Sequence, residues 1–255
     1  MDMPLIEGCV DSYESCAAAC RGGADRLELC ANLSIGGTTP SPAFFRQVKR
    51  DFSVPVHVLI RPRFGDFLYT REELAQMEEE IRMFRELGAS GVVFGALTPD
   101  GDLDMEAMAR LMGCAGDMHV TLHRAFDMTR DPLEALEDAV RLDCRTILTS
   151  GQARSAAEGK EVLRAVFRQA AGRLDIMAGS GVKRGNILEI HRYTGIRAFH
   201  TTGRRGPVES GMRYRKEGVS MGLPSLSEYE LWRTDEEEFR ACGEIVHALA
   251  REVGN

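Results

Sequence analysis

A compact set of ionisable side chains follows the apolar stretch MHVTLH. His123 ends this stretch, Arg124 comes next, and Asp127 lies just before the Asp-Pro pair at 131–132, which is typical of a helix start. Imidazole, guanidinium and carboxylate groups can transfer protons or bind an anion. In proteins built from alternating strands and helices, ligands bind at the carboxyl ends of the strands. The segment therefore predicts a functional site, with His123 and Asp127 as catalytic candidates and Arg124 as a substrate-binding candidate.

Further ionisable side chains alternate with apolar residues in other strand-like stretches. Because successive side chains of a strand point to opposite faces, we expect Glu7, Glu28 and His200 on one inner face. On neighbouring strands about 4.8 Å apart, two carboxylates and an imidazole can act as acid and base or hold a cation. We predict Glu28 or Glu7 as the general base, and His123 or His200 as its acid partner. The alternative is a polar network that satisfies itself and only supports the fold.

Two kinds of loop after strands carry groups suited to an anion. Arg61 and Arg63 stand one proline apart, with Asp66 close by, and guanidinium groups bind carboxylate or phosphate in a fork. Neutralisation of nearby carboxylates is the alternative for these arginines. The loops after the seventh and eighth strands of a barrel commonly hold phosphate through backbone N–H groups, and tight turning is the alternative reason for their glycines. The candidates there are Gly179, Ser180, Gly181, Thr202 and Gly203.

The elements that position these residues are short apolar runs in alternation with helix-compatible segments. This alternation predicts one (β/α)₈ barrel domain over residues 1–255, with a long loop at 204–233 that serves as a lid or as a contact in a homo-oligomer. We predict strands at 5–10, 26–30, 56–60, 91–95, 118–123, 145–150, 173–179 and 196–201. We predict helices at 12–21, 42–50, 71–87, 105–114, 132–142, 156–171, 184–193 and 234–252.

The composition excludes several classes of protein. A formal net charge of −7 argues against a nucleic-acid partner, which would need a basic face. No run of about 18 apolar residues occurs, which argues against a membrane span, and the first residues lack the pattern of a signal peptide. Seven cysteines are an odd number, which predicts reduced thiols rather than a disulfide framework. We expect a cytoplasmic protein whose partner is a small molecule or a metal ion.

Several motifs resemble those of the CutC family, which is named for copper homeostasis. The similar segments run from Pro4 to about Gly222 and include EGCVDSYESCAAACRGGADRLELCANLSIGGTTPS, IRPRFGDFLYT, GVVFGALTPDGDLD, VTLHRAFD, ILTSGQ, IMAGSGV and FHTTG. The chain differs from the family's usual pattern at Gly8, where the family has Val or Ile, and at Thr202, where it often has Ser. The resemblance implies a cytosolic (β/α)₈ barrel and Cu(I) binding through Cys9 and Cys30.

Two function classes therefore stand side by side. Soft thiolates select Cu(I), and inward cysteines on adjacent strands are close enough for a two-coordinate site. A copper-binding role leaves the many polar strand ends without a purpose, whereas an enzyme acting on a small anionic or phosphorylated metabolite would use them for acid–base chemistry. Both readings place the site at the carboxyl end of the barrel.

Overall fold

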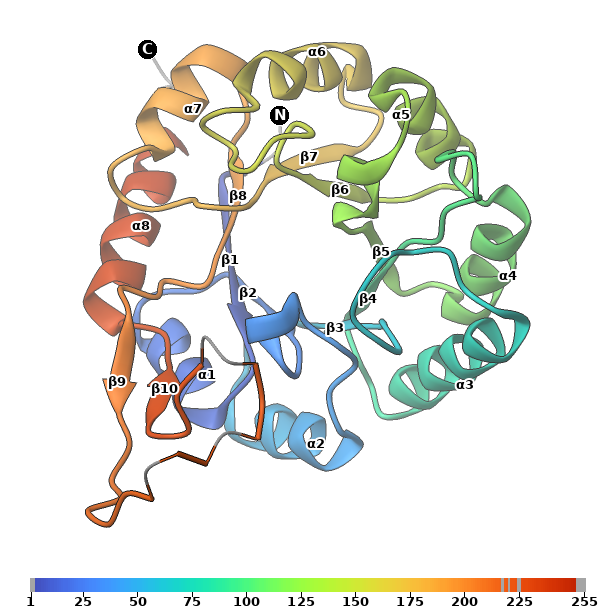
Figure 1. Cartoon of the computed structure of the whole chain (residues 1–255). Helices are drawn as coiled ribbons and strands as arrows, with labels where there is room; N and C mark the ends of the chain where they lie inside the picture. The colour runs from blue at the N-terminus through green and yellow to red at the C-terminus, as the bar shows by residue number, and fades with distance from the viewer. Residues whose placement is uncertain (1–2, 217, 220, 224–225, 251–255) are drawn as a thin grey trace.

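Eight parallel strands follow one another in chain order around a closed barrel, and β8 pairs with β1 to complete it (Figure 1). The structure is a computed structural model that describes residues 3–216, 218–219, 221–223 and 226–250. The predicted (β/α)₈ fold is confirmed. The strands are β1 (Leu5–Val10), β2 (Arg26–Leu29), β3 (Val56–Leu59), β4 (Gly91–Phe94), β5 (His119–Leu122), β6 (Thr146–Thr149), β7 (Asp175–Ala178) and β8 (Ala198–Thr201).

The helices form a ring around the strands (Figure 1). Local sequence fixes where they begin: the Asp131 carboxylate accepts hydrogen bonds from the backbone N–H groups of Leu133 (2.8 Å) and Glu134 (3.2 Å), and Pro132 opens the helix. The helices are α1 (Tyr13–Arg21), α2 (Pro42–Asp51), α3 (Arg71–Glu86), α4 (Met105–Ala115), α5 (Pro132–Arg141), α6 (Lys160–Ala170), α7 (Ile187–Thr194) and α8 (Glu236–Ala248), with two 3₁₀ turns, η1 (Leu33–Ile35) and η2 (Arg124–Met128).

The alternation of side chains along the strands sorts the molecule into an apolar shell and a polar centre. The outward residues, such as Ile6, Leu27 and Phe199, are fully buried between the strands and the helices. The inward residues include buried charged and polar groups instead of the branched apolar residues that usually fill a barrel. The rings of His57 and His119, for example, lie with their centroids 4.7 Å apart. The two faces of the strands therefore differ in character, as the alternation of apolar and ionisable residues predicts.

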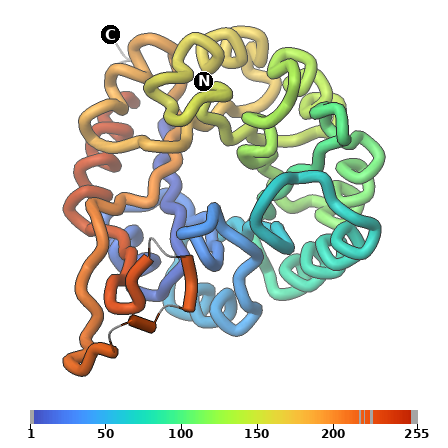
Figure 2. Tube along the Cα trace, in the orientation of Figure 1, coloured from blue at the N-terminus to red at the C-terminus, as the bar shows by residue number. Residues whose placement is uncertain are grey.

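The segment 204–233 contains a short antiparallel ribbon that the sequence did not indicate. β9 (Pro207–Glu209) pairs with β10 (Glu230–Trp232), and the tube representation shows the segment extending outward from the ring rather than across its centre (Figure 2). Its role as a lid or an oligomer contact stays a prediction. In the described part of the chain, no helix combines the length and the apolar character needed to span a membrane.

Candidate functional site

A cavity of about 390 Å³ opens at the carboxyl ends of the strands. Glu28, His123 and His200, three of the predicted acid–base residues, line it. The thiols of Cys9 and Cys30 line it as well, so the barrel brings both predicted kinds of chemistry into one space. The other lining residues are Leu33, Gly36, Leu59, Arg61, Phe67, Arg124, Leu148, Ser180, Gly181, Val182, Lys183, Thr201, Thr202, Gly203, Arg204 and Glu238.

The two thiols line this cavity from adjacent strands. Cys9 is in register with Glu28 in the pairing of β1 with β2, and Cys30 is the next inward residue after Glu28. The Sγ atoms are 3.8 Å apart, and Cys30 Sγ lies 3.7 Å from Glu28 Oε2. Both cysteines are buried and free, in a small apolar cluster with Leu59 and Val93. One ligand atom from each of Cys9, Glu28 and Cys30 falls within 4.8 Å of the others.

His200 stands between two carboxyl groups. Its Nδ1 lies 2.6 Å from Glu7 Oε1, and its Nε2 lies 3.6 Å from Glu28 Oε2. Burial by itself lowers the pKa of His200, but the charges of Cys9 and Glu28 and a hydrogen bond to Glu7 outweigh it and raise the pKa well above its usual value. The imidazole is therefore held as an imidazolium, oriented by Glu7.

The charges of the remaining groups follow from their neighbours. The hydrogen bond between Cys9 and Cys30 lowers the pKa of Cys9 to about 5. Burial acts in the opposite direction, and the charge of His200 lowers the pKa further. Burial and the neighbouring Cys9 raise the pKa of Cys30 well above its usual range. Burial, followed by the charge of Cys9, likewise raises the pKa of Glu28. Cys9 therefore loses its proton more readily than Cys30, and the raised pKa of Glu28 suits the role of an acid better than the predicted role of a base.

Glu7 lies beneath the cavity and is not among the described residues that line it, so its predicted placement at the cavity is wrong. Its Oε2 accepts a hydrogen bond from Arg26 Nε at 2.5 Å. Burial favours the neutral acid, but Arg26 and His200 outweigh it and hold the pKa of Glu7 well below its usual range. Glu7 therefore positions His200 from behind instead of meeting a ligand.

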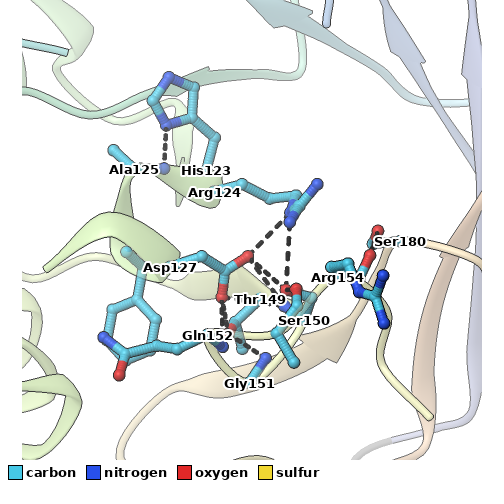
Figure 3. A network of polar contacts seen from close by, with 12 residues as sticks. His123, Arg124, Ala125, Asp127, Thr149, Ser150, Gly151, Gln152, Arg154 and Ser180 are labelled. Atoms are coloured by element: carbon cyan, nitrogen blue, oxygen red, sulfur yellow. Dashed lines mark hydrogen bonds and ion pairs between the residues drawn. The ribbon is translucent and has the colours of Figure 1, made fainter. Parts of the chain in front are cut away.

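His123 reaches the cavity from the wall opposite β1 as a neutral group. Its Nδ1 accepts a hydrogen bond from the Ala125 N–H at 3.2 Å (Figure 3), so the proton sits on Nε2. That Nε2 is buried and has no hydrogen-bond partner within the described part of the chain. Burial, followed by the charge of Arg61, lowers the pKa of His123 to about 3. The group can donate a hydrogen bond to a ligand, but it does not carry the extra proton of the predicted acid.

The two arginines of the loop after β3 use most of their donors in hydrogen bonds within the protein. Arg61 lines the cavity, yet its Nη1 donates to the carbonyls of Gly36 and Gly37, both at 3.1 Å, and its Nη2 donates to that of Gly65 at 2.7 Å. Arg63 binds Glu73 (Nε–Oε1 2.6 Å) and Asp66 (Nη2–Oδ1 3.1 Å).

Arg63 and Asp66 are not among the described residues that line the cavity, so the prediction that they bind the substrate there is wrong. Glu73 is part of the capping box of α3, and it draws Arg63 toward that helix.

Asp127 is surrounded by donors from the last residue of β6 and the loop that follows it (Figure 3). Its carboxylate accepts hydrogen bonds from Thr149 Oγ1 (2.5 Å), Ser150 N (3.0 Å) and Gln152 N (3.1 Å). It also pairs with Arg124 Nε at 2.8 Å. With its acceptor positions filled in this way, Asp127 holds the loop and places Arg124 at the cavity, so the predicted catalytic role does not fit its contacts.

Substitution Asp127→Asn tests this structural role. We expect the free energy of unfolding to fall by about 2–3 kcal/mol, because the amide nitrogen would face backbone and hydroxyl donors that lose their acceptor. Asp66→Asn is the matched control, since that carboxylate is 68% exposed, and it should leave the urea midpoint unchanged. Equal midpoints for both variants would show that the loop does not depend on Asp127.

The loops after β7 and β8 supply part of the predicted anion site. Ser180, Gly181, Thr202 and Gly203 line the cavity, whereas Gly179 is not among the described lining residues. The N–H of Gly179 donates to the Thr149 carbonyl at 2.9 Å, and that of Gly203 donates to Thr201 Oγ1 at 3.1 Å. These two backbone donors are therefore not available to a ligand, which corrects the prediction for both.

Arg26, the buried partner of Glu7, is a charged residue of this network that the sequence interpretation missed. Arg26 lies two residues before Glu28 and four before Cys30, so its side chain points inward like theirs. It is in register with Glu7. The alternation that selected Glu28 could therefore have selected Arg26 as well.

The comparisons with known proteins identify the family of this chain. The sequence model of the CutC family matches residues 4–205. A CutC family protein from Chromobacterium violaceum is 45% identical over 95% of this chain and 98% of its own length. The human copper homeostasis protein cutC homolog is 46% identical over 94% of this chain and 88% of its own. The crystal structure of a CutC protein from Streptococcus agalactiae has a TM-score of 0.75 and 32% identity, over 78% of this chain and 99% of that one. The chain therefore belongs to the CutC family.

Proposed function

We propose that this protein binds one Cu(I) ion through Cys9 and Cys30, which line the cavity. The observation that carries this proposal is the pair of buried thiols with Sγ atoms 3.8 Å apart. Metal–thiolate bonds of about 2.3 Å span up to about 4.6 Å when two of them are collinear, so the pair can close on one ion with little movement. Thiolates are the ligands that select Cu(I) over harder cations.

The surrounding residues support a site for a monovalent, soft cation. The apolar contacts of Leu59 and Val93 shield the sulfurs from water, and Cys9 already carries a negative charge beside His200. The seven cysteines are free thiols, which persist in a reducing compartment, and we place the protein in the cytoplasm on that ground.

Titration with Cu(I) under reducing conditions tests the proposal. We expect one tightly bound ion per chain, and X-ray absorption should show sulfur as the only near neighbour of copper. The measurement would use a competing Cu(I) chelator to fix the affinity. An ion surrounded by nitrogen or oxygen alone would exclude the cysteine pair as its site.

A second function, acid–base chemistry on a small anionic or hydroxylated metabolite, is favoured by the form of the cavity. Its 390 Å³ is far more space than a single ion needs, and Glu28, His200 and the Nε2–H of His123 meet there from different walls. Arg124 and the loop residues Ser180, Gly181 and Thr202 stand at the same cavity and are the groups to hold an anionic end, such as a phosphate.

A thermal-shift screen with inorganic phosphate, sugar phosphates and small hydroxy acids tests this second function. We expect at least one compound to raise the melting temperature, and Glu28→Gln to abolish that shift while leaving Cu(I) affinity intact, because a two-coordinate site needs only the thiolates. If none of the compounds stabilises the protein, and Glu28→Gln only makes the fold more stable, the carboxyl group is structural and the second function is excluded.

A further inference from the structure

A second cavity lies at the opposite mouth of the barrel, at the amino-terminal ends of β6, β7 and β8. Its volume is about 340 Å³, and it is separate from the cysteine pair. Phe167, Leu174, Ile176 and Ala198 supply apolar walls, and Arg26 and Thr146 bring polar groups. A concave, mostly apolar space with a few polar groups is the usual form of a small-molecule site.

Arg26 is the feature that gives this cavity a chemical preference. Arg26 is only 7% exposed. Its Nε donates a hydrogen bond to Glu7, and its Nη2 contacts the Met177 thioether at 3.6 Å. A guanidinium has five N–H donors, and within the described residues its Nη1 has no hydrogen-bond partner. Among the described residues, this Nη1 is not one of the buried side-chain atoms that lack a partner, so it is open to the cavity, where a ligand's acceptor would complete its hydrogen bonds.

The charged residues that line the cavity carry one more positive than negative charge. Arg26 and Arg197 both line it, and Asp175 is the carboxylate on the same wall. Glu7 already neutralises one side of Arg26, so a ligand with a single negative charge fits better than a dianion. A carboxylate matches the planar fork of a guanidinium, and it would bind at the remaining edge of Arg26.

We propose that this lower cavity binds a small monocarboxylic acid with a compact apolar body, such as an aromatic or branched-chain acid. The carboxylate accepts hydrogen bonds from Arg26, and the body packs against Phe167, Leu174 and Ile176. The site is independent of the cysteine pair, so its absence would leave the copper proposal untouched.

Calorimetric titration of the full chain with benzoate and with 3-methylbutyrate tests the proposal, with benzamide as the neutral counterpart of benzoate. We expect saturable binding of one carboxylate per chain, at least about tenfold tighter than the amide, which corresponds to about 1.4 kcal/mol. No saturable binding of either acid, or equal binding of benzoate and benzamide, would overturn the proposal.

Two substitutions locate the ligand. Arg26→Lys keeps the positive charge beside Glu7 but removes the fork, and Ala198→Leu narrows the cavity without changing Arg26. Each should weaken benzoate at least about tenfold. Arg154→Lys, on a side chain that is 92% exposed, is the control and should not change the affinity.

If one of the two variants fails to fold by circular dichroism, the other decides. Unchanged benzoate affinity in a folded Arg26→Lys or Ala198→Leu protein contradicts the proposal.

Discussion

Replacing Cys9 and Cys30 together by serine is expected to lower the affinity for Cu(I) at least about 100-fold, which corresponds to about 2.8 kcal/mol. Serine preserves the size of the side chains but replaces two soft sulfur donors by hydroxyl groups, which are poor ligands for Cu(I). Each single variant should retain a weakened site, because Glu28 stays within reach of either sulfur. Competition with a Cu(I) chelator measures all three affinities.

The matched control is the pair Cys16 and Cys20 on α1. These thiols are four residues apart on one helix, and burial raises their pKa values to about 12 and about 11, so they resist ionisation. Cys16→Ala/Cys20→Ala should bind Cu(I) like the wild type. A Cys9→Ser/Cys30→Ser protein with unchanged stoichiometry and affinity would move the copper site to another part of the chain.

The second large effect is expected at Glu7. Glu7→Leu should lower the free energy of unfolding by about 3–5 kcal/mol, because it leaves the buried guanidinium of Arg26 without its partner. Adding Arg26→Leu should recover the part of this loss that comes from the unpaired guanidinium, while the loss of the Glu7 contact with His200 remains in both variants. Urea unfolding of the wild type, both single variants and the double variant closes the cycle.

A surface ion pair provides the comparison for this cycle. Glu137 and Arg173 are joined at 2.7 Å, but their side chains are 36% and 40% exposed, so solvent screens the pair. Glu137→Gln should change stability far less than Glu7→Leu. If the losses from Glu7→Leu and Arg26→Leu simply add in the double variant, the two groups are not coupled.

The fold was predictable because its signals are local. The periods of strands and helices and the residues that begin helices lie within short segments, and all eight barrel strands fall inside the predicted ranges. The side-chain alternation and the order of the strands also predict that Glu28, Cys9, Cys30 and His200 are neighbours. What alternation cannot show is the depth of each residue along the barrel axis, and Glu7 was misplaced for this reason.

Residues 156–159 show where local signals fail. The sequence predicts a helix from 156, yet α6 begins at Lys160. The loop after β6 first winds around Asp127, and it brings Gly159 so close to β6 that a Cβ there would lie 2.0 Å from the Ser150 carbonyl oxygen. The prediction that Arg63 binds a substrate is wrong for a similar reason, because its partner Glu73 lies ten residues later in the sequence, on α3. Contacts of this kind depend on how separate segments pack together, and the helix and strand propensities of individual residues contain no information about that packing.

The polar centre of the barrel has a consequence for how stability varies with temperature. Arg26, Glu7 and His200 form a chain of hydrogen bonds in the space that branched apolar side chains usually fill. Unfolding exposes these groups to water, and exposed polar surface lowers the heat capacity change by about 0.26 cal/K/mol per Å², whereas apolar surface raises it by about 0.45. The stability curve of this barrel should therefore be flatter than that of an apolar-filled barrel of equal size, and it should lose less stability on cooling.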